Sequence, residues 1–82
     1  MTWQEMCDKV NAGTLPGHQM RVFEEKEALD YKIDKLYVFI NIVDGFKDIS
    51  VEEQTLAKKQ YEIMKAYSQA LTDRIGFFST EP

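Results

Sequence analysis

Apolar residues recur every seven positions between Arg21 and Val43. The repeating positions are Val22, Leu29, Leu36 and Val43, with Ile33 and Ile40 between them. On an α-helix this spacing keeps the apolar side chains in one stripe, while the acids and lysines of the same stretch fall largely elsewhere. The pattern therefore predicts a long amphipathic helix over residues 18–43.

A second stretch near the C-terminus has the same character. Apolar residues are spaced by threes, fours and sevens at Leu56, Ile63, Met64, Tyr67, Leu71, Ile75 and Phe78. These positions predict a helix over residues 50–76 with one apolar side. Two amphipathic helices of similar length bury their stripes by packing on each other, so we expect an antiparallel hairpin.

Local signals mark the ends of the predicted helices. Thr2 and Glu5 have the spacing of a capping box, which predicts a short first helix through Val10 that Asn11, Ala12 and Gly13 end. Residues 14–17 contain Pro16 and read as a turn, so residues 1–17 form a short helix and turn. Asp44-Gly45 predicts a left-handed exit from the long helix, and Ser50 with Glu53 predicts a second capping box. Phe46 and Ile49 are expected to plug the closed end of the hairpin.

The size of the chain bears on its assembly. With 82 residues and one cysteine, it forms a single all-α domain over residues 1–82 that has a small core and no internal disulfide. No spacing of ligands suggests a metal, and we expect no cofactor. Self-association is the remaining way to supplement the core, so the hairpin is predicted to assemble as a homo-oligomer.

Charge narrows the possible partners. The net charge is −4, and residues 1–50 hold nine acids against six bases, which disfavours duplex nucleic acid. A small anionic ligand stays possible, because a pocket needs only a few local cations. The longest apolar run, Leu36 to Val43, contains Asn41 and is too short to cross a membrane, and the N-terminus does not resemble a signal peptide. We therefore expect a soluble, cytoplasmic protein.

Few residues suggest chemistry. The sequence shows no nucleophile beside a base and no paired carboxylates, so no catalytic residue is predicted. The acidic stretch Glu24 to Asp30, interleaved with Lys26 and Lys32, reads as a solvated face. Tyr67 is expected in the core. The other three tyrosines, Tyr31, Tyr37 and Tyr61, are expected nearer its edges, as rim residues of the hairpin or as contacts to another subunit, with packing favoured over ligand binding.

Two basic residues near the start of the long helix have both a structural and a binding interpretation. His18 follows Pro16-Gly17 at the start of the long helix, where free amides favour an anion, and Arg21 lies one turn further on. Alternatively, His18 only begins the helix and Arg21 pairs with Glu24 or Glu25. Arg74 near the end of the last helix is expected to interact with the helix dipole.

The order of residues from His18 to Ile40, followed by a Phe46 loop and by Leu56, Gln60, Met64, Tyr67, Leu71 and Arg74, resembles a family of small phage proteins. These are the crAss-phage-related short helical proteins, which include the anti-CBASS cyclic-oligonucleotide sponges. The likeness covers residues 18–75. It implies a helical protomer that assembles into a hexamer, binds cyclic di- or trinucleotides between protomers without cleaving them, and so blunts an immune signal in the infected bacterial host cell.

The resemblance also implies a set of ligand-binding residues. The sponges stack a base on an aromatic residue before the long helix and meet a phosphate with a lysine within it; the corresponding positions are His18 and either Lys32 or Lys35, with Arg21 nearby. Arg74 matches an arginine that lines the trinucleotide pocket of some members. His18 is a departure, because a stacking tyrosine is expected there. The alternative prediction is a helical protein–protein interaction module without a nucleotide ligand.

Overall fold

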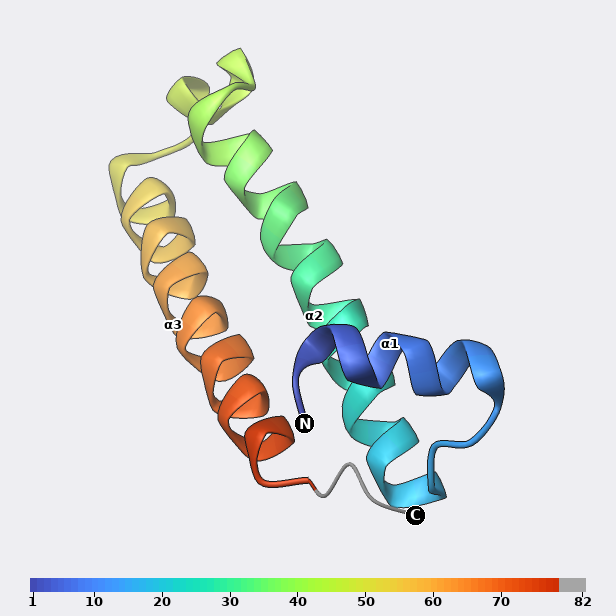
Figure 1. Ribbon diagram of the computed structural model, residues 1–82. Helices are drawn as coiled ribbons and strands as arrows, with labels where there is room; N and C mark the ends of the chain where they lie inside the picture. The colour runs from blue at the N-terminus through green and yellow to red at the C-terminus, as the bar shows by residue number, and fades with distance from the viewer. Residues whose placement is uncertain (79–82) are drawn as a thin grey trace.

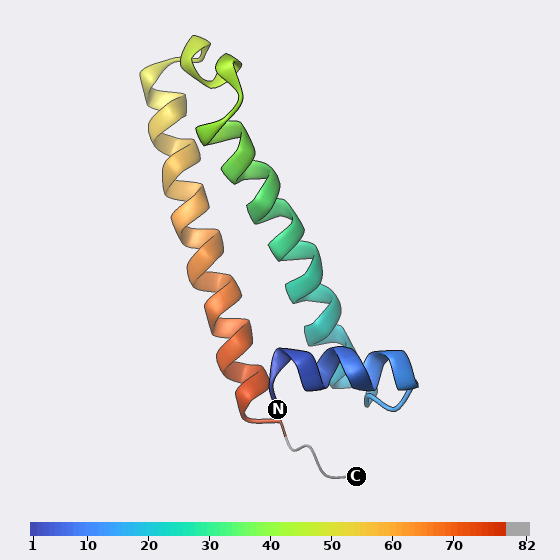
Figure 2. The same cartoon turned by 45° about the horizontal axis from the view of Figure 1, so that its top comes forward.

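Three helices and one short 3-10 turn make up the protein in the computed structural model, which describes residues 1–78. The helices are α1 (Trp3–Ala12), α2 (Gly17–Asn41) and α3 (Val51–Gly76), and the 3-10 helix η1 (Asp44–Asp48) joins the two long ones. α2 and α3 run antiparallel side by side, and α1 crosses α2 near the open end of this hairpin (Figure 1, Figure 2). The prediction of an all-α chain with a short helix and a long hairpin is confirmed.

The helix ends follow the local sequence at most positions. Thr2 and Glu5 form the predicted capping box, and Gly13 ends α1 with a left-handed φ of 69°. At the start of α3, the Ser50 side chain accepts a hydrogen bond from the backbone N–H of Glu53. The prediction for Gly45 is wrong: only Gly13 has a positive φ within residues 1–78, because the chain leaves α2 through η1.

The core lies at the open end, where α1 meets the hairpin. The cluster joins Met6 of α1 to residues of both long helices, namely Val22, Phe23, Leu29, Leu71 and Ile75. Met6, Leu71 and Ile75 have almost no exposed surface. At the other end, the buried Phe46 packs edge-on against Phe39 with ring centroids 5.4 Å apart, so the predicted plug over the hairpin is confirmed for Phe46.

Several residues of the predicted apolar stripes are exposed. Val43 of the first stripe is 44% exposed, and Tyr67, which was expected in the core, is 46% exposed. Leu56 and Ile63 of α3 are more than half exposed. The apolar positions of α3 thus cover a wider arc than α2 alone can bury. Within the described residues, none of the helices combines the length and apolar character of a membrane span.

Candidate functional site

Each long helix carries two parallel rows of side chains on the hairpin. The inner row of α2 runs through Val22, Lys26, Leu29, Ile33, Leu36 and Ile40, and that of α3 through Ala57, Tyr61, Met64, Ser68, Leu71 and Ile75. All of these are buried or partly buried. Their alternating spacing of four and three residues is the one that keeps a helix face toward a partner. These rows form the contact between α2 and α3.

A second row precedes each inner row by one residue. It runs through Arg21, Glu25, Ala28, Lys32, Lys35 and Phe39 on α2, and through Leu56, Gln60, Ile63, Tyr67, Ala70 and Arg74 on α3. All but the partly buried Phe39 are exposed. Because the helices are antiparallel, the same one-residue offset turns both rows to the same side of the hairpin. We call this surface the open face.

The opposite side of the hairpin carries α1 at its open end. Trp3 of α1 stacks on Phe23, with ring centroids 4.9 Å apart, and Phe23 follows the inner-row residue Val22. In Figure 1, α1 crosses in front of α2 on this side. The open face therefore lies on the side away from α1.

Four of the five predicted site residues lie on the open face. Arg21 and Arg74 lie at its open end, and Lys32 and Lys35 lie near its middle, all exposed to solvent. Arg21 and Lys32 are eleven residues apart, so their Cα atoms are separated by about 16 Å along α2. The cations of one chain thus form two separate pairs. Arg21 makes no ion pair with any residue from 1 to 78, including Glu24 and Glu25.

His18 lies beside the C-terminal end of α3. Its imidazole is in edge-on contact with the ring of Phe78, with centroids 6.3 Å apart. His18 is exposed to solvent. His18 is therefore near Arg21 and Arg74 and far from Lys35, and it cannot serve one small site together with that lysine.

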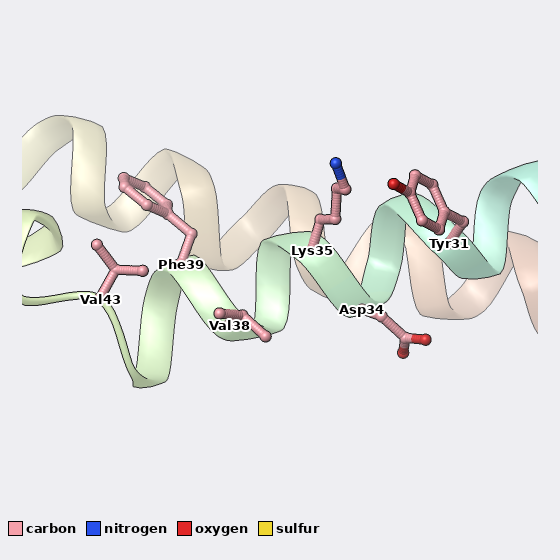
Figure 3. Close-up of a pocket in the computed structure, with 6 residues that line it drawn as sticks. All are labelled: Tyr31, Asp34, Lys35, Val38, Phe39 and Val43. Atoms are coloured by element: carbon pink, nitrogen blue, oxygen red, sulfur yellow. The ribbon is translucent and has the colours of Figure 1, made fainter.

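A shallow hollow lies at the edge of the open face. It has a volume of about 440 Å³ and is lined by Tyr31, Asp34, Lys35, Val38, Phe39 and Val43 (Figure 3). All of these come from the second half of α2 or directly follow it. The volume falls in the range of small-molecule sites. The hollow is open, however, because residues of one helix side form its whole wall.

Tyr31 and Lys35 supply the chemistry of this hollow. The Lys35 ammonium lies 4.8 Å from the centre of the Tyr31 ring, and both side chains project to the same side of α2 (Figure 3). Tyr31 is 62% exposed, which leaves its aromatic ring available for stacking. Asp34 points away from them (Figure 3). A flat ring beside a mobile cation suits a ligand that carries both an aromatic base and a phosphate.

From the sequence, Tyr31 was expected at the rim of the hairpin or at a contact to another subunit, with packing favoured over ligand binding. The signal that identifies the pair is its spacing of four residues, which places Tyr31 and Lys35 one turn apart on a helix. Tyr61 and Lys65 have the same spacing, and the Lys65 ammonium lies 4.7 Å from the Tyr61 ring. Neither the hollow beside Tyr31 nor a second one, which is lined by Val51, Glu52, Thr55 and Leu56, contains Tyr61 or Lys65 in its wall. The tertiary surroundings therefore distinguish the two pairs, and the spacing does not.

Lys26 is buried, so the interpretation of its surroundings as a solvated face is wrong at this position. Its ammonium donates hydrogen bonds to Asp30 Oδ2 at 2.8 Å and to Ser68 Oγ at 2.9 Å. The Ser68 hydroxyl donates to the other oxygen of Asp30, and the Lys26 ammonium also lies 5.2 Å from the Trp3 ring. This network joins all three helices and has its hydrogen-bond partners inside the protein.

Metal ligands are not grouped in the structure. Within residues 1–78, no cluster of three or more His, Cys, Asp or Glu side chains is arranged to hold a metal ion. The single cysteine, Cys7, is partly buried in α1 beside the core cluster.

The long hairpin matches a known protein family. A family model described as Sequestin matches residues 16–77, which contain all of α2, η1 and α3. The chain belongs to the Sequestin family. Comparisons with curated proteins and with solved structures give no match.

Membership of the Sequestin family bears on the kind of function. The name denotes sequestration, which indicates binding of a ligand rather than its chemical conversion. The matched residues contain the hollow, Tyr31 and Lys35, and every cation of the open face. α1 precedes the matched residues and lies on the other side of the hairpin. The open face and the hollow are therefore the surfaces to consider for the sequestered ligand.

Proposed function

We propose that this protein sequesters a cyclic oligonucleotide signal, a cyclic di- or trinucleotide, and holds it without cleaving it. The observation that carries the proposal is the Tyr31–Lys35 pair on the wall of the hollow, within the residues matched by the Sequestin family. An aromatic ring and a primary ammonium are the two groups that a base and a phosphate need. Sequestration requires no catalytic residue.

The ligand sites are shared between copies of the chain in this proposal. Small-molecule sites usually bury most of their ligand, whereas the hollow has a wall on one side only. A second protomer supplies the opposite wall and a second set of cations. A cyclic dinucleotide carries two bases and two phosphates, which match two copies of one site in a symmetric oligomer. A hexamer is the assembly that the resemblance to the phage sponges implies.

The cations then have distinct roles. Lys35 contacts a phosphate in the hollow, with Lys32 one turn away, and Tyr31 stacks on a base in place of the tyrosine expected before the helix. Arg21 and Arg74, with His18 near the same end of the hairpin, form a second site that binds an anion. Arg21 lies about 16 Å from Lys32 along α2. Two separate sites per chain agree with a family in which di- and trinucleotides bind at different pockets.

Sequestration has a simple biological consequence. A protein that binds a nucleotide signal tightly lowers its free concentration in proportion to the number of sites. In a bacterial cell infected by a phage, the lower concentration of free signal would weaken a CBASS-type immune response, because less of the nucleotide would reach its effector. The proposal places the protein in the cytoplasm of that cell, where the signal is made.

Calorimetry with a panel of cyclic di- and trinucleotides tests the proposal. At least one member should bind with micromolar affinity or tighter and should be recovered intact after heat denaturation of the protein. AMP and ATP serve as linear controls. Failure of every cyclic nucleotide to bind, or recovery of hydrolysed ligand, would contradict the proposal.

The same measurement on a lysine variant locates the site. Lys35→Ala should weaken the best ligand about 10- to 150-fold, since a hydrogen bond to a charged group contributes about 1.5 to 3 kcal/mol. Lys65→Ala is the control, because the Lys65 ammonium lies at a similar distance from a tyrosine ring but does not line the hollow. The affinity of the Lys65→Ala variant for the same ligand should stay within twofold of the affinity of the original protein. Equal losses in the two variants would argue for a general effect of charge.

The alternative is a helical module that binds a protein and no nucleotide. The exposed apolar residues Leu56, Ile63 and Tyr67 favour it, because contiguous apolar surface marks interaction sites. This function predicts that the nucleotide panel gives no heat of binding at all, so the calorimetric experiment also separates the two functions.

A further inference from the structure

Gln19 holds a buried polar atom that has no hydrogen-bond partner. The residue is 9% exposed, and within residues 1–78 its Oε1 is the one buried side-chain nitrogen or oxygen without a partner. A buried polar group without a hydrogen bond destabilises a folded protein, so each one needs a physical reason. A methionine would fill the same space without that cost, because it has a similar length and no strongly polar atom.

The position of Gln19 places it next to the second site of the proposed function, at the open end of the hairpin. Gln19 precedes Val22 by three residues, so it begins the inner row of α2. Its neighbour His18 precedes Arg21 by three residues and begins the row of the open face in the same way. Gln19 therefore lies at the border between the helix contact and the open face. Its side chain has three rotatable bonds, so the amide can turn toward the open face without a change in the backbone.

The two arginines of this site come opposite each other. His18 of α2 contacts Phe78 of α3 at the open end. One turn along each helix from this contact, Arg21 follows His18 and Arg74 precedes Phe78. Because the helices are antiparallel, the two arginines reach the same level of the hairpin. Neither forms an ion pair with any residue from 1 to 78, so both guanidinium groups are available to a phosphate.

Phe77 adds an aromatic surface at the same end. It is 92% exposed and follows Arg74 by three residues, so it continues the α3 row of the open face. Its backbone N–H donates a hydrogen bond to the Arg74 carbonyl at 3.1 Å, which holds the residue in the register of the helix. A ring with so much exposed surface contributes little to packing in the single chain, whereas a nucleobase can stack on it.

We infer that Gln19 and Phe77 recognise an adenine base at the second site, where Arg21 and Arg74 bind the phosphate; the inference rests on the proposed function. Phe77 supplies the stacking surface. A glutamine amide pairs with adenine through two hydrogen bonds, in which Oε1 accepts from the N6 amino group and Nε2 donates to N7. The base thus supplies the donor that Oε1 lacks in the protein alone. Hypoxanthine has an oxygen in place of the N6 amino group, so it cannot supply that donor.

Gln19→Met distinguishes base recognition from a structural role, because it should raise stability and lower affinity. Without nucleotide, the variant should melt at least about 2 °C higher, since it removes a buried polar group that has no partner. Its affinity for cyclic tri-AMP should fall about 5- to 150-fold, the range expected for an amide–adenine pair. Its affinity for cyclic tri-IMP, which carries hypoxanthine, should stay within twofold of the original protein. Scanning calorimetry and titration calorimetry measure the two effects.

Gln69→Met is the matched control. Gln69 is exposed, donates a hydrogen bond to Asp73 Oδ1 at 3.0 Å, and follows the inner-row residue Ser68, which places it on the side away from the open face. This variant should not melt higher than the original protein, and its affinity for cyclic tri-AMP should stay within twofold.

Phe77→Ala tests the stacking surface separately. Because Phe77 is almost fully exposed, the melting temperature should stay within about 1 °C. The affinity for cyclic tri-AMP should fall at least about fivefold, since stacking of one base is lost. Phe77→Tyr should restore most of it, because tyrosine keeps an aromatic face.

Three results would overturn the inference: an unchanged affinity of Gln19→Met for cyclic tri-AMP, a lower melting temperature of that variant, or an unchanged affinity of Phe77→Ala. If the original protein binds cyclic dinucleotides but not cyclic tri-AMP, the inference fails while the proposed function stands. If it binds no cyclic nucleotide, both fail.

Discussion

At the scale of single residues, surroundings decide whether a charged side chain is structural or available for a ligand. Lys26 and Lys32 lie on the same helix among similar neighbours in sequence. Lys26 is buried against Asp30, Ser68 and the Trp3 ring, whereas Lys32 is exposed on the open face. A buried ammonium must keep its hydrogen-bond partners, because an unpaired one is costly.

Substitution of these two lysines should therefore give different stabilities. Lys26→Ala should lower the free energy of unfolding by about 1 to 3 kcal/mol, since it removes the two hydrogen bonds that the ammonium donates to Asp30 Oδ2 and Ser68 Oγ. Lys32→Ala should change the free energy of unfolding by no more than about 0.5 kcal/mol. Urea unfolding followed by circular dichroism measures both. Equal stabilities would show that the Lys26 network contributes nothing to folding.

At the scale of helices and their ends, two glycines with similar sequence signals have different roles. Gly13 ends α1 in the left-handed region, where its backbone N–H bonds to the carbonyls of Lys9 and Val10. Gly45 lies in η1 without a positive φ, and a Cβ there would meet only Val43 Cγ1 at 3.8 Å, an ordinary contact. Only the first position needs glycine for its backbone conformation.

A pair of alanine variants tests this difference. Gly13→Ala should lower the free energy of unfolding by about 1 kcal/mol, because a side chain is strained at a left-handed φ. Gly45→Ala should be neutral or slightly stabilising, because it reduces the freedom of the unfolded chain without adding strain. Thermal unfolding at one protein concentration is the measurement. A larger loss for Gly45→Ala would contradict the assignment of η1.

At the scale of the whole molecule, the core is concentrated at one end. The buried cluster of Met6, Leu29, Leu71 and their neighbours lies where α1 meets the hairpin, while the apolar row of α3 extends beyond it into solvent. A chain of 82 residues buries little surface by itself, so contacts between copies should form a substantial part of its stability.

The melting temperature should consequently depend on protein concentration. A hundredfold increase, from about 2 to 200 μM, shifts a dimerisation equilibrium by about 2.7 kcal/mol. A dimer unfolds as one unit of about 160 residues, for which 1 kcal/mol corresponds to about 2 to 4 °C, so we expect a rise of about 5 to 11 °C. Scanning calorimetry at the two concentrations measures it. Ile63→Asp, which puts a carboxylate in the apolar row of α3, is the variant expected to show no such rise. A concentration-independent melting temperature in the original protein would indicate a self-sufficient monomer.

The sequence by itself determined the helices, their antiparallel pairing and most of their ends, because these depend on periodicity and on local capping, which act over a few residues. The assignment of Lys32 or Lys35 to a phosphate came from the resemblance to the phage sponges and stays a prediction. Periodicity cannot show which arc of a wide apolar stripe the partner helix covers. Only the tertiary structure decided that Tyr67 and Ile63 are exposed and that Lys26 is buried. Burial and proximity depend on contacts between residues far apart in the chain, such as Lys26 with Ser68, and no local pattern encodes those contacts.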